Sequence, residues 1–123
     1  MNAEISGKRL RINGRSIDFE QRIVKTVEID DRIVVLLNSD DFKDGDELVG
    51  RNIVAVNKEG EIDWRIEYHG FKVRNRKDVE VPQAFFGLWL EDDGRTLRAG
   101  VPVADFVVDP ENGMFRSVEL TQR

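Results

Sequence analysis

The sequence predicts an all-β fold, an antiparallel meander of about ten short strands, because short β-branched and apolar runs recur along its whole length between turn residues. A second observation is an absence. No stretch combines the 3.6-residue apolar period of an amphipathic helix with a capping signal, so we expect helices of a single turn at most. Thirdly, the stretches 55–64 and 107–116 look like two copies of one hairpin.

Length and composition indicate one all-β domain over residues 1–123. A chain of this size buries roughly two-thirds of the surface that it exposes when unfolded, which is enough for one core. The chain has no cysteine, which excludes disulfides, zinc-thiolate sites and cysteine nucleophiles, and permits a cytoplasmic location. Its polar N-terminus and short apolar runs predict neither a signal peptide nor a membrane span. We expect a soluble, cytoplasmic protein.

Two hairpins are predicted in the N-terminal third. The first pairs 8–12 with 15–19 across Asn13-Gly14, a dipeptide that accepts the positive φ angles of a type I′ turn. The second pairs 23–29 with 32–37 across two aspartates, with β-branched residues on both sides. Because the later strand of this pair is apolar on both faces, we expect it to lie at the centre, covered on both sides.

An acidic loop and a third hairpin follow. Residues 38–50 break the strand pattern and have room for a short helical turn. The hairpin then pairs 52–56 with 62–68 across a turn that contains Gly60. Alternation along its second strand puts three apolar residues on one face: Ile62, Trp64 and Ile66.

The rest of the chain supplies the remaining strands. Residues 71–81 predict a strand that frays into a loop. A hairpin pairs 84–90 with 96–101 across an Asp-Asp-Gly turn. The closing hairpin pairs 104–108 with 114–120. Each of these runs is short and ends at turn residues, as expected for a meander.

The repeat can be stated as a shift of the chain by 53 residues. This shift superimposes Gly60 on Gly113 and Leu36-Leu37 on Trp89-Leu90. It predicts that both glycines lie in turns at hairpin tips and that Trp64 is buried.

The two repeated units resemble blades of quinoprotein-type β-propellers, over about residues 33–68 and 86–120. The first unit matches the blade motif at Ala55, Asn57, Gly60 and Trp64. The second keeps Asp109, Asn112 and Gly113, with Val107 in place of the alanine and Ser117 in place of the tryptophan. The resemblance implies that the tryptophan docks between neighbouring blades. Since a closed propeller usually needs four to eight blades, we expect these hairpins to form an open sheet, a sandwich or a partly closed barrel.

No residue pattern identifies a catalytic or cofactor site. His69 is the single histidine, and no serine lies in a nucleophile-elbow context. One group of carboxylates around Gly45 is a weak candidate for binding a hard cation: Asp40, Asp41, Asp44, Asp46 and Glu47. The EF-hand register fails there, which favours a solvated loop. We expect no cofactor.

Basic residues that alternate along one predicted strand, Lys72, Arg74 and Arg76, lie close to aromatic residues in the sequence. Such interleaving is one way to bind single-stranded nucleic acid. The net charge of −5 argues against nucleic acid as a partner, and a solvated strand face is the competing interpretation.

The hypothesis that remains is a non-enzymatic binding protein whose partner is another protein or a second copy of itself. It is based on the many sheet edges and on aromatic residues expected at the surface: Phe85, Phe86 and Trp89. In one version the protein is an antagonist or immunity-type protein whose acidic loop covers a basic site. The alternatives are a metal-dependent module or enzyme that uses the acidic loop and His69, and a nucleic-acid binder that uses Lys72, Arg74 and Arg76.

Overall fold

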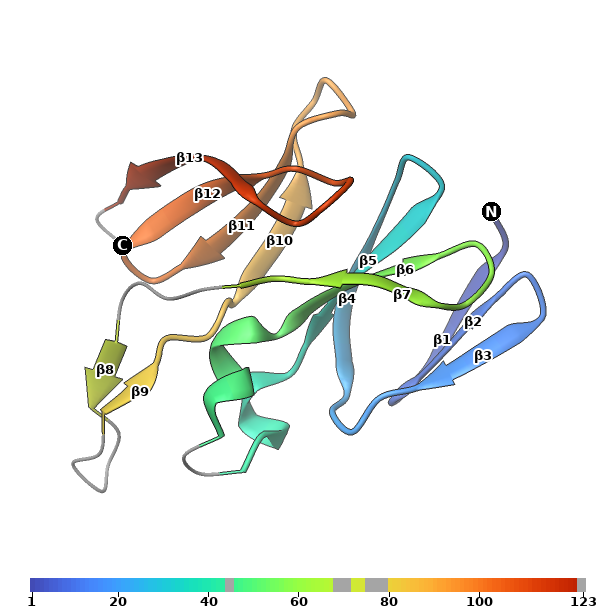
Figure 1. Cartoon of the computed structure of the whole chain (residues 1–123), viewed down its shortest axis with the longest axis horizontal. Helices are drawn as coiled ribbons and strands as arrows, with labels where there is room; N and C mark the ends of the chain where they lie inside the picture. The colour runs from blue at the N-terminus through green and yellow to red at the C-terminus, as the bar shows by residue number, and fades with distance from the viewer. Residues whose placement is uncertain (44–45, 68–71, 75–79, 122–123) are drawn as a thin grey trace.

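The structure is a computed structural model that describes residues 1–43, 46–67, 72–74 and 80–121. Within those ranges the chain forms thirteen strands and two short 3₁₀ helices (Figure 1). All strand pairs are antiparallel, and none of the sheets closes into a barrel. The predicted all-β meander is therefore confirmed.

Three sheets and a short ribbon make up the fold, and within each the strands follow chain order. The first sheet contains β1 (Ala3–Ser6), β2 (Arg9–Ile12) and β3 (Arg15–Asp18). The middle sheet contains β4 (Ile23–Ile29), β5 (Arg32–Leu37), β6 (Ile53–Asn57) and β7 (Ile62–Arg65). The ribbon pairs β8 (Lys72–Arg74) with β9 (Glu80–Pro82). The last sheet contains β10 (Gly87–Leu90), β11 (Leu97–Val101), β12 (Ala104–Val108) and β13 (Phe115–Leu120).

The predicted hairpin turns form where local chemistry favours them. Asn13 and Gly14 both have positive φ, 51° and 82°, as a type I′ turn requires. Asp30 and Asp31 adopt the same left-handed region, with φ of 50° and 59°. Strand β1 was not predicted, because its four residues are all exposed and only their pairing with β2 orders them.

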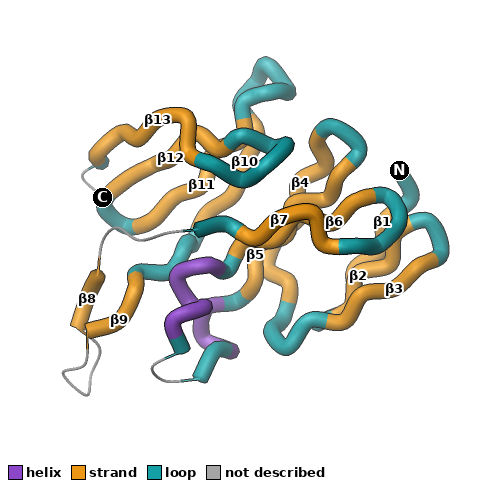
Figure 2. The backbone as a smooth tube through the Cα atoms, in the orientation of Figure 1, coloured by secondary structure: helices purple, strands orange, loops and turns teal. Residues whose placement is uncertain are grey.

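The middle sheet lies between the other two, so both of its faces are covered (Figure 2). One face packs on the last sheet in a core that includes Val34, Leu36, Leu88, Ala99 and Phe106. The opposite face packs on β2 of the first sheet in a second core that includes Leu10, Ile12, Ile33, Val35 and Val56. Strand β5 contributes to both cores, which confirms its predicted central position.

A β-bulge changes the predicted face of β7. Ala55 pairs with Trp64 but Val56 pairs with Ile62, so Asp63 is an extra residue in the strand. The bulge moves Ile62 to the other face, where its side chain is 53% exposed, whereas Trp64 and Ile66 are buried. The prediction that all three residues share one face was therefore wrong for Ile62.

The closing hairpins of the middle and last sheets each have a glycine in the turn and one extra residue in the final strand, but the two sheets do not match at a constant shift. Strand β13 has its extra residue at Arg116, which is 53 positions after Asp63. Leu36-Leu37, however, ends the second strand of its sheet, whereas Trp89-Leu90 ends the first strand of the other. The predicted superposition of these dipeptides was wrong. In the middle sheet the connection between β5 and β6 contains both 3₁₀ helices, whereas the equivalent strands of the last sheet, β11 and β12, are joined by a tight turn.

Candidate functional site at the outer edges of two sheets

The acidic loop folds into two 3₁₀ helices, η1 (Ser39–Asp41) and η2 (Glu47–Arg51), and its carboxylates have local partners. Asp41 accepts two hydrogen bonds from the Arg22 guanidinium, both 2.9 Å, and one from the Arg22 backbone N–H at 2.8 Å. Asp46 caps η2 by accepting from the N–H of Leu48 at 2.9 Å.

The other acidic residues considered for cation binding are exposed or are not fully described by the structure. Asp40 is exposed, Asp44 lies outside the described residues, and only the backbone of Glu47 is described. In the described parts of the chain, no three acidic or histidine side chains come close enough together to hold a metal ion.

The Arg22–Asp41 pair makes stability depend on pH. The hydrogen bonds from Arg22 lower the pKa of Asp41 to about 2, below the ordinary aspartate value near 4. A lowered folded-state pKa contributes stability above the ordinary value, and this contribution is lost as pH falls toward 2. We expect Asp41→Asn to flatten the fall in Tm between about pH 5 and pH 2, measured by thermal unfolding. Asp40→Asn is the matched control; an equal flattening in both variants would contradict this assignment.

The three aromatic residues expected at the surface have different environments. Phe85 was expected to be exposed and is instead 1% exposed, because its ring joins the core and contacts Phe106 edge-on. Phe86 is 53% exposed. Trp89 is half-buried on the outer face of the last sheet, where its ring lies against Gly87. Of the three, Phe86 and Trp89 keep solvent-exposed surface.

A buried amide that the sequence did not reveal explains the burial of Phe85. Asn52 is completely buried. Its Nδ2 donates to the carbonyls of Leu37 at 2.9 Å and Phe85 at 2.8 Å, and its Oδ1 accepts from the Phe85 N–H at 3.0 Å. This side chain ties the segment that enters β10 to the middle sheet. A lone Asn between an arginine and an isoleucine carries no signal of this role.

The basic candidates fall partly beyond what the structure describes. The backbones of Lys72 and Arg74 lie in β8. Arg76 and His69 lie outside the described residues.

Trp64 joins the middle sheet to the last one. Its Nε1 donates to the carbonyl of Pro110 at 2.9 Å, and its ring lies on Gly113 so closely that an added Cβ would approach it to 2.4 Å. Gly113 is in the turn between β12 and β13, with φ of 76°. Gly60 is at the corresponding place between β6 and β7. Both predictions, a buried Trp64 and glycines at hairpin tips, are confirmed.

The first sheet docks on the middle one at the corresponding turn, by different side chains. Asn13 Nδ2 donates to the carbonyl of Lys58 at 3.3 Å, and a Cβ added to Gly60 would lie 3.2 Å from that of Arg15. Each of these two turns begins with a polar residue, and the carbonyl of the next residue accepts a hydrogen bond from the preceding sheet. That residue is Lys58 in the middle sheet and Pro110 in the last sheet. The hairpin turns are therefore the joints between sheets.

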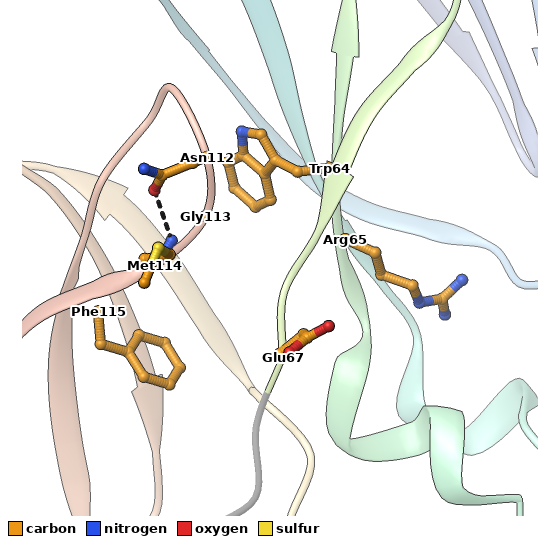
Figure 3. Close-up of a pocket in the computed structure, with 7 residues that line it drawn as sticks. All are labelled: Trp64, Arg65, Glu67, Asn112, Gly113, Met114 and Phe115. Atoms are coloured by element: carbon orange, nitrogen blue, oxygen red, sulfur yellow. Dashed lines mark hydrogen bonds between the residues drawn. The ribbon is translucent and has the colours of Figure 1, made fainter.

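A pocket of about 650 Å³ opens beside the Trp64 joint, between β7 and the β12–β13 hairpin (Figure 3). Its described lining consists of Trp64, Arg65, Glu67, Asn112, Gly113, Met114 and Phe115. Trp64 and Phe115 provide aromatic surface, and the Phe115 ring stacks on Phe106 at 4.3 Å between centroids. Arg65 is directed away from the other lining side chains and donates from Nε to the carbonyl of Arg51 at 2.7 Å.

Strand β13 continues from this pocket and lies at the edge of the last sheet. Two apolar residues of β13 are largely exposed, Val118 at 56% and Leu120 at 74%. Met114, which directly precedes the strand, is 67% exposed. Val118 and Leu120 share a face because they pair with the buried residues Phe106 and Ala104. An apolar row on an edge strand is a feature that soluble proteins usually avoid unless something covers it.

The backbone of β13 also presents hydrogen-bonding groups at this edge. Thr121 donates its N–H to the carbonyl of Val103, on the side of β12. Backbone groups of alternate residues point to the same side in an antiparallel ladder, so those of Ser117 and Glu119 also point toward β12. Those of Val118 and Leu120 point outward, and no described strand pairs with them. The edge can therefore accept another strand.

Comparison with known families places the chain by its N-terminal two-thirds. The family described as Domain of unknown function (DUF7957) matches residues 1–81. The chain belongs to the DUF7957 family. This match spans the first sheet, the middle sheet and the β8–β9 ribbon up to residue 81, and it ends before the last sheet. No curated protein and no solved structure shows significant similarity to the chain.

One further finding concerns membranes. Among the residues that the structure describes, no helix is long and apolar enough to cross a bilayer.

Proposed function

We propose that this chain is a non-enzymatic protein-binding domain whose contact surface is the outer edge of β13 together with the adjoining pocket. The observation that supports it most is the edge itself. Val118 and Leu120 expose apolar side chains and direct their backbone groups outward from the same positions.

A partner strand would use both properties at once. Its backbone would complete the hydrogen-bond ladder, and side chains on its apolar face would cover the β13 row and reach toward the pocket beside Trp64 and Phe115. Strand addition of this kind derives affinity from the main chain and specificity from side-chain pockets. The first and last sheets carry charged pairs on their outward faces, such as Arg9–Asp18 and Arg98–Glu119, so those faces fit solvent better than a protein core.

The test uses the whole tagged chain as bait in an extract of its source cells, with the recovered proteins identified by mass spectrometry. We expect the wild type and the Val24→Lys variant to recover the same protein, whether another protein or untagged copies of this chain. Val118→Lys should recover at least about tenfold less, the equivalent of about 1.4 kcal/mol. Val24 is the matched control because its side chain is also 56% exposed, on β4.

The proposal is wrong if no protein is recovered, or if recovery is the same with Val118→Lys as with the wild type. Circular dichroism of both variants establishes that they are folded, which is expected because both positions are exposed.

A further inference from the structure

We infer that the occupant of the β13 edge is the β13 edge of a second copy of this chain, paired antiparallel about Val118. This inference rests on the proposed function and names its partner. The result would be one continuous sheet across two copies, in which the two last sheets are related by a two-fold axis.

The pattern of outward backbone groups allows this pairing. Val118 points its N–H and C=O outward, so it can exchange two hydrogen bonds with Val118 of the second copy. In the same register Arg116 lies opposite Leu120, at the next pair on each side. Arg116 is the extra residue of the β13 bulge, so the regular part of this ladder spans residues 117–119 of each copy and is centred on the Val118 pair.

The side chains also match across this register. Val118 packs on its own counterpart, with both Leu120 side chains at diagonal positions on the same face, where cross-strand apolar pairs stabilise a sheet. On the opposite face Ser117 lies across from Glu119, so a small hydroxyl side chain that can donate faces a long carboxylate. The exposed apolar row of each copy is thereby continued by that of the other.

Neighbouring registers fit less well. A shift in one direction places Glu119 directly opposite Glu119 of the second copy, and like charges at that spacing are destabilising. A shift in the other direction leaves Leu120 opposite Met114, which precedes the strand. Strand β13 also holds neither proline nor lysine, the residues that commonly protect an edge. A pairing of one surface with itself produces a closed dimer, the commonest form of assembly.

The first test is the mass of the purified chain in solution, by sedimentation velocity over a range of concentrations. We expect a mass that rises from one copy to two and then stops. Val118→Lys should weaken dimerisation at least about tenfold by placing two ammonium groups opposite each other. Val24→Lys should leave it unchanged.

Single cysteines test the register, since the chain has none of its own. Residues directly opposite in a hydrogen-bonded pair have Cα atoms about 5.5 Å apart, within the range of a disulfide. On mild oxidation Val118→Cys should form a covalent dimer, whereas Ser117→Cys and Glu119→Cys should do so only when mixed with each other. Val24→Cys, at an equally exposed position on β4, measures random collision.

The outcomes separate the two proposals. A chain that stays monomeric at every concentration, or a Val118→Cys variant that cross-links no faster than Val24→Cys, overturns the self-pairing. If the extract experiment still recovers another protein that Val118→Lys loses, the proposed function stands with a different occupant. If neither association occurs, both are wrong.

Discussion

Replacing Asn52 by alanine is expected to lower the free energy of unfolding by about 3–5 kcal/mol, because each buried polar group that loses its partner costs about 1–3 kcal/mol. The change removes a partner from three backbone groups: the carbonyl of Leu37 and both the carbonyl and the N–H of Phe85. It also removes side-chain volume from a completely buried position. Urea unfolding with linear extrapolation measures the difference.

Asn112→Ala is the control for this experiment. Asn112 is exposed, and its side chain accepts one hydrogen bond, from the N–H of Met114 at 2.9 Å. We expect that substitution to cost about 1 kcal/mol or less. A loss of similar size in both variants would mean that the buried amide does not hold β10 to the middle sheet.

Trp64→Ala is expected to cost a similar amount, about 3–5 kcal/mol, the usual range for removing a buried tryptophan. The substitution removes the ring that packs on Gly113 and the hydrogen bond from that ring to the carbonyl of Pro110. Trp64→Phe keeps an aromatic ring there but removes the donor, so its cost should be nearer 1 kcal/mol. The same urea experiment measures both variants.

Trp89 provides the comparison within the same chain. It is half-buried, on the outer face of the last sheet, and an alanine there leaves the contacts between sheets in place. We expect Trp89→Ala to lose less than half as much stability as Trp64→Ala. Equal losses would contradict the role of Trp64 as the joint between the middle and last sheets.

Most strands could be predicted because their signals are local. Asn13-Gly14 forms its turn from its own φ preferences, and the β-branched run of β5 predicts a strand covered on both faces wherever it packs. The closing hairpin of each four-stranded sheet was also predictable from its turn glycine, Gly60 or Gly113. These features depend on residues that are neighbours in the chain.

Features that depend on distant residues could not be predicted. Phe85 and Phe86 are adjacent and chemically identical, yet one is buried and the other is half-exposed, because Asn52 from another sheet binds the backbone of Phe85. The bulge at Asp63 reversed the expected face of Ile62. The candidate site was missed for the same reason, since exposure of Val118 and Leu120 depends on which strands lie beside β13.

By itself, the amino-acid sequence determined the fold class, the hairpins and the residues at their tips, because turn chemistry and strand periodicity act over a few residues. Only the tertiary structure decided how the sheets stack, where Trp64 docks and which apolar side chains of β13 are exposed. Those outcomes depend on contacts between sheets, such as the hydrogen bond from Trp64 to Pro110 across 46 positions of the chain. Which of two like neighbours in the chain is buried is a property of the packed sheets together, as Phe85 and Phe86 show.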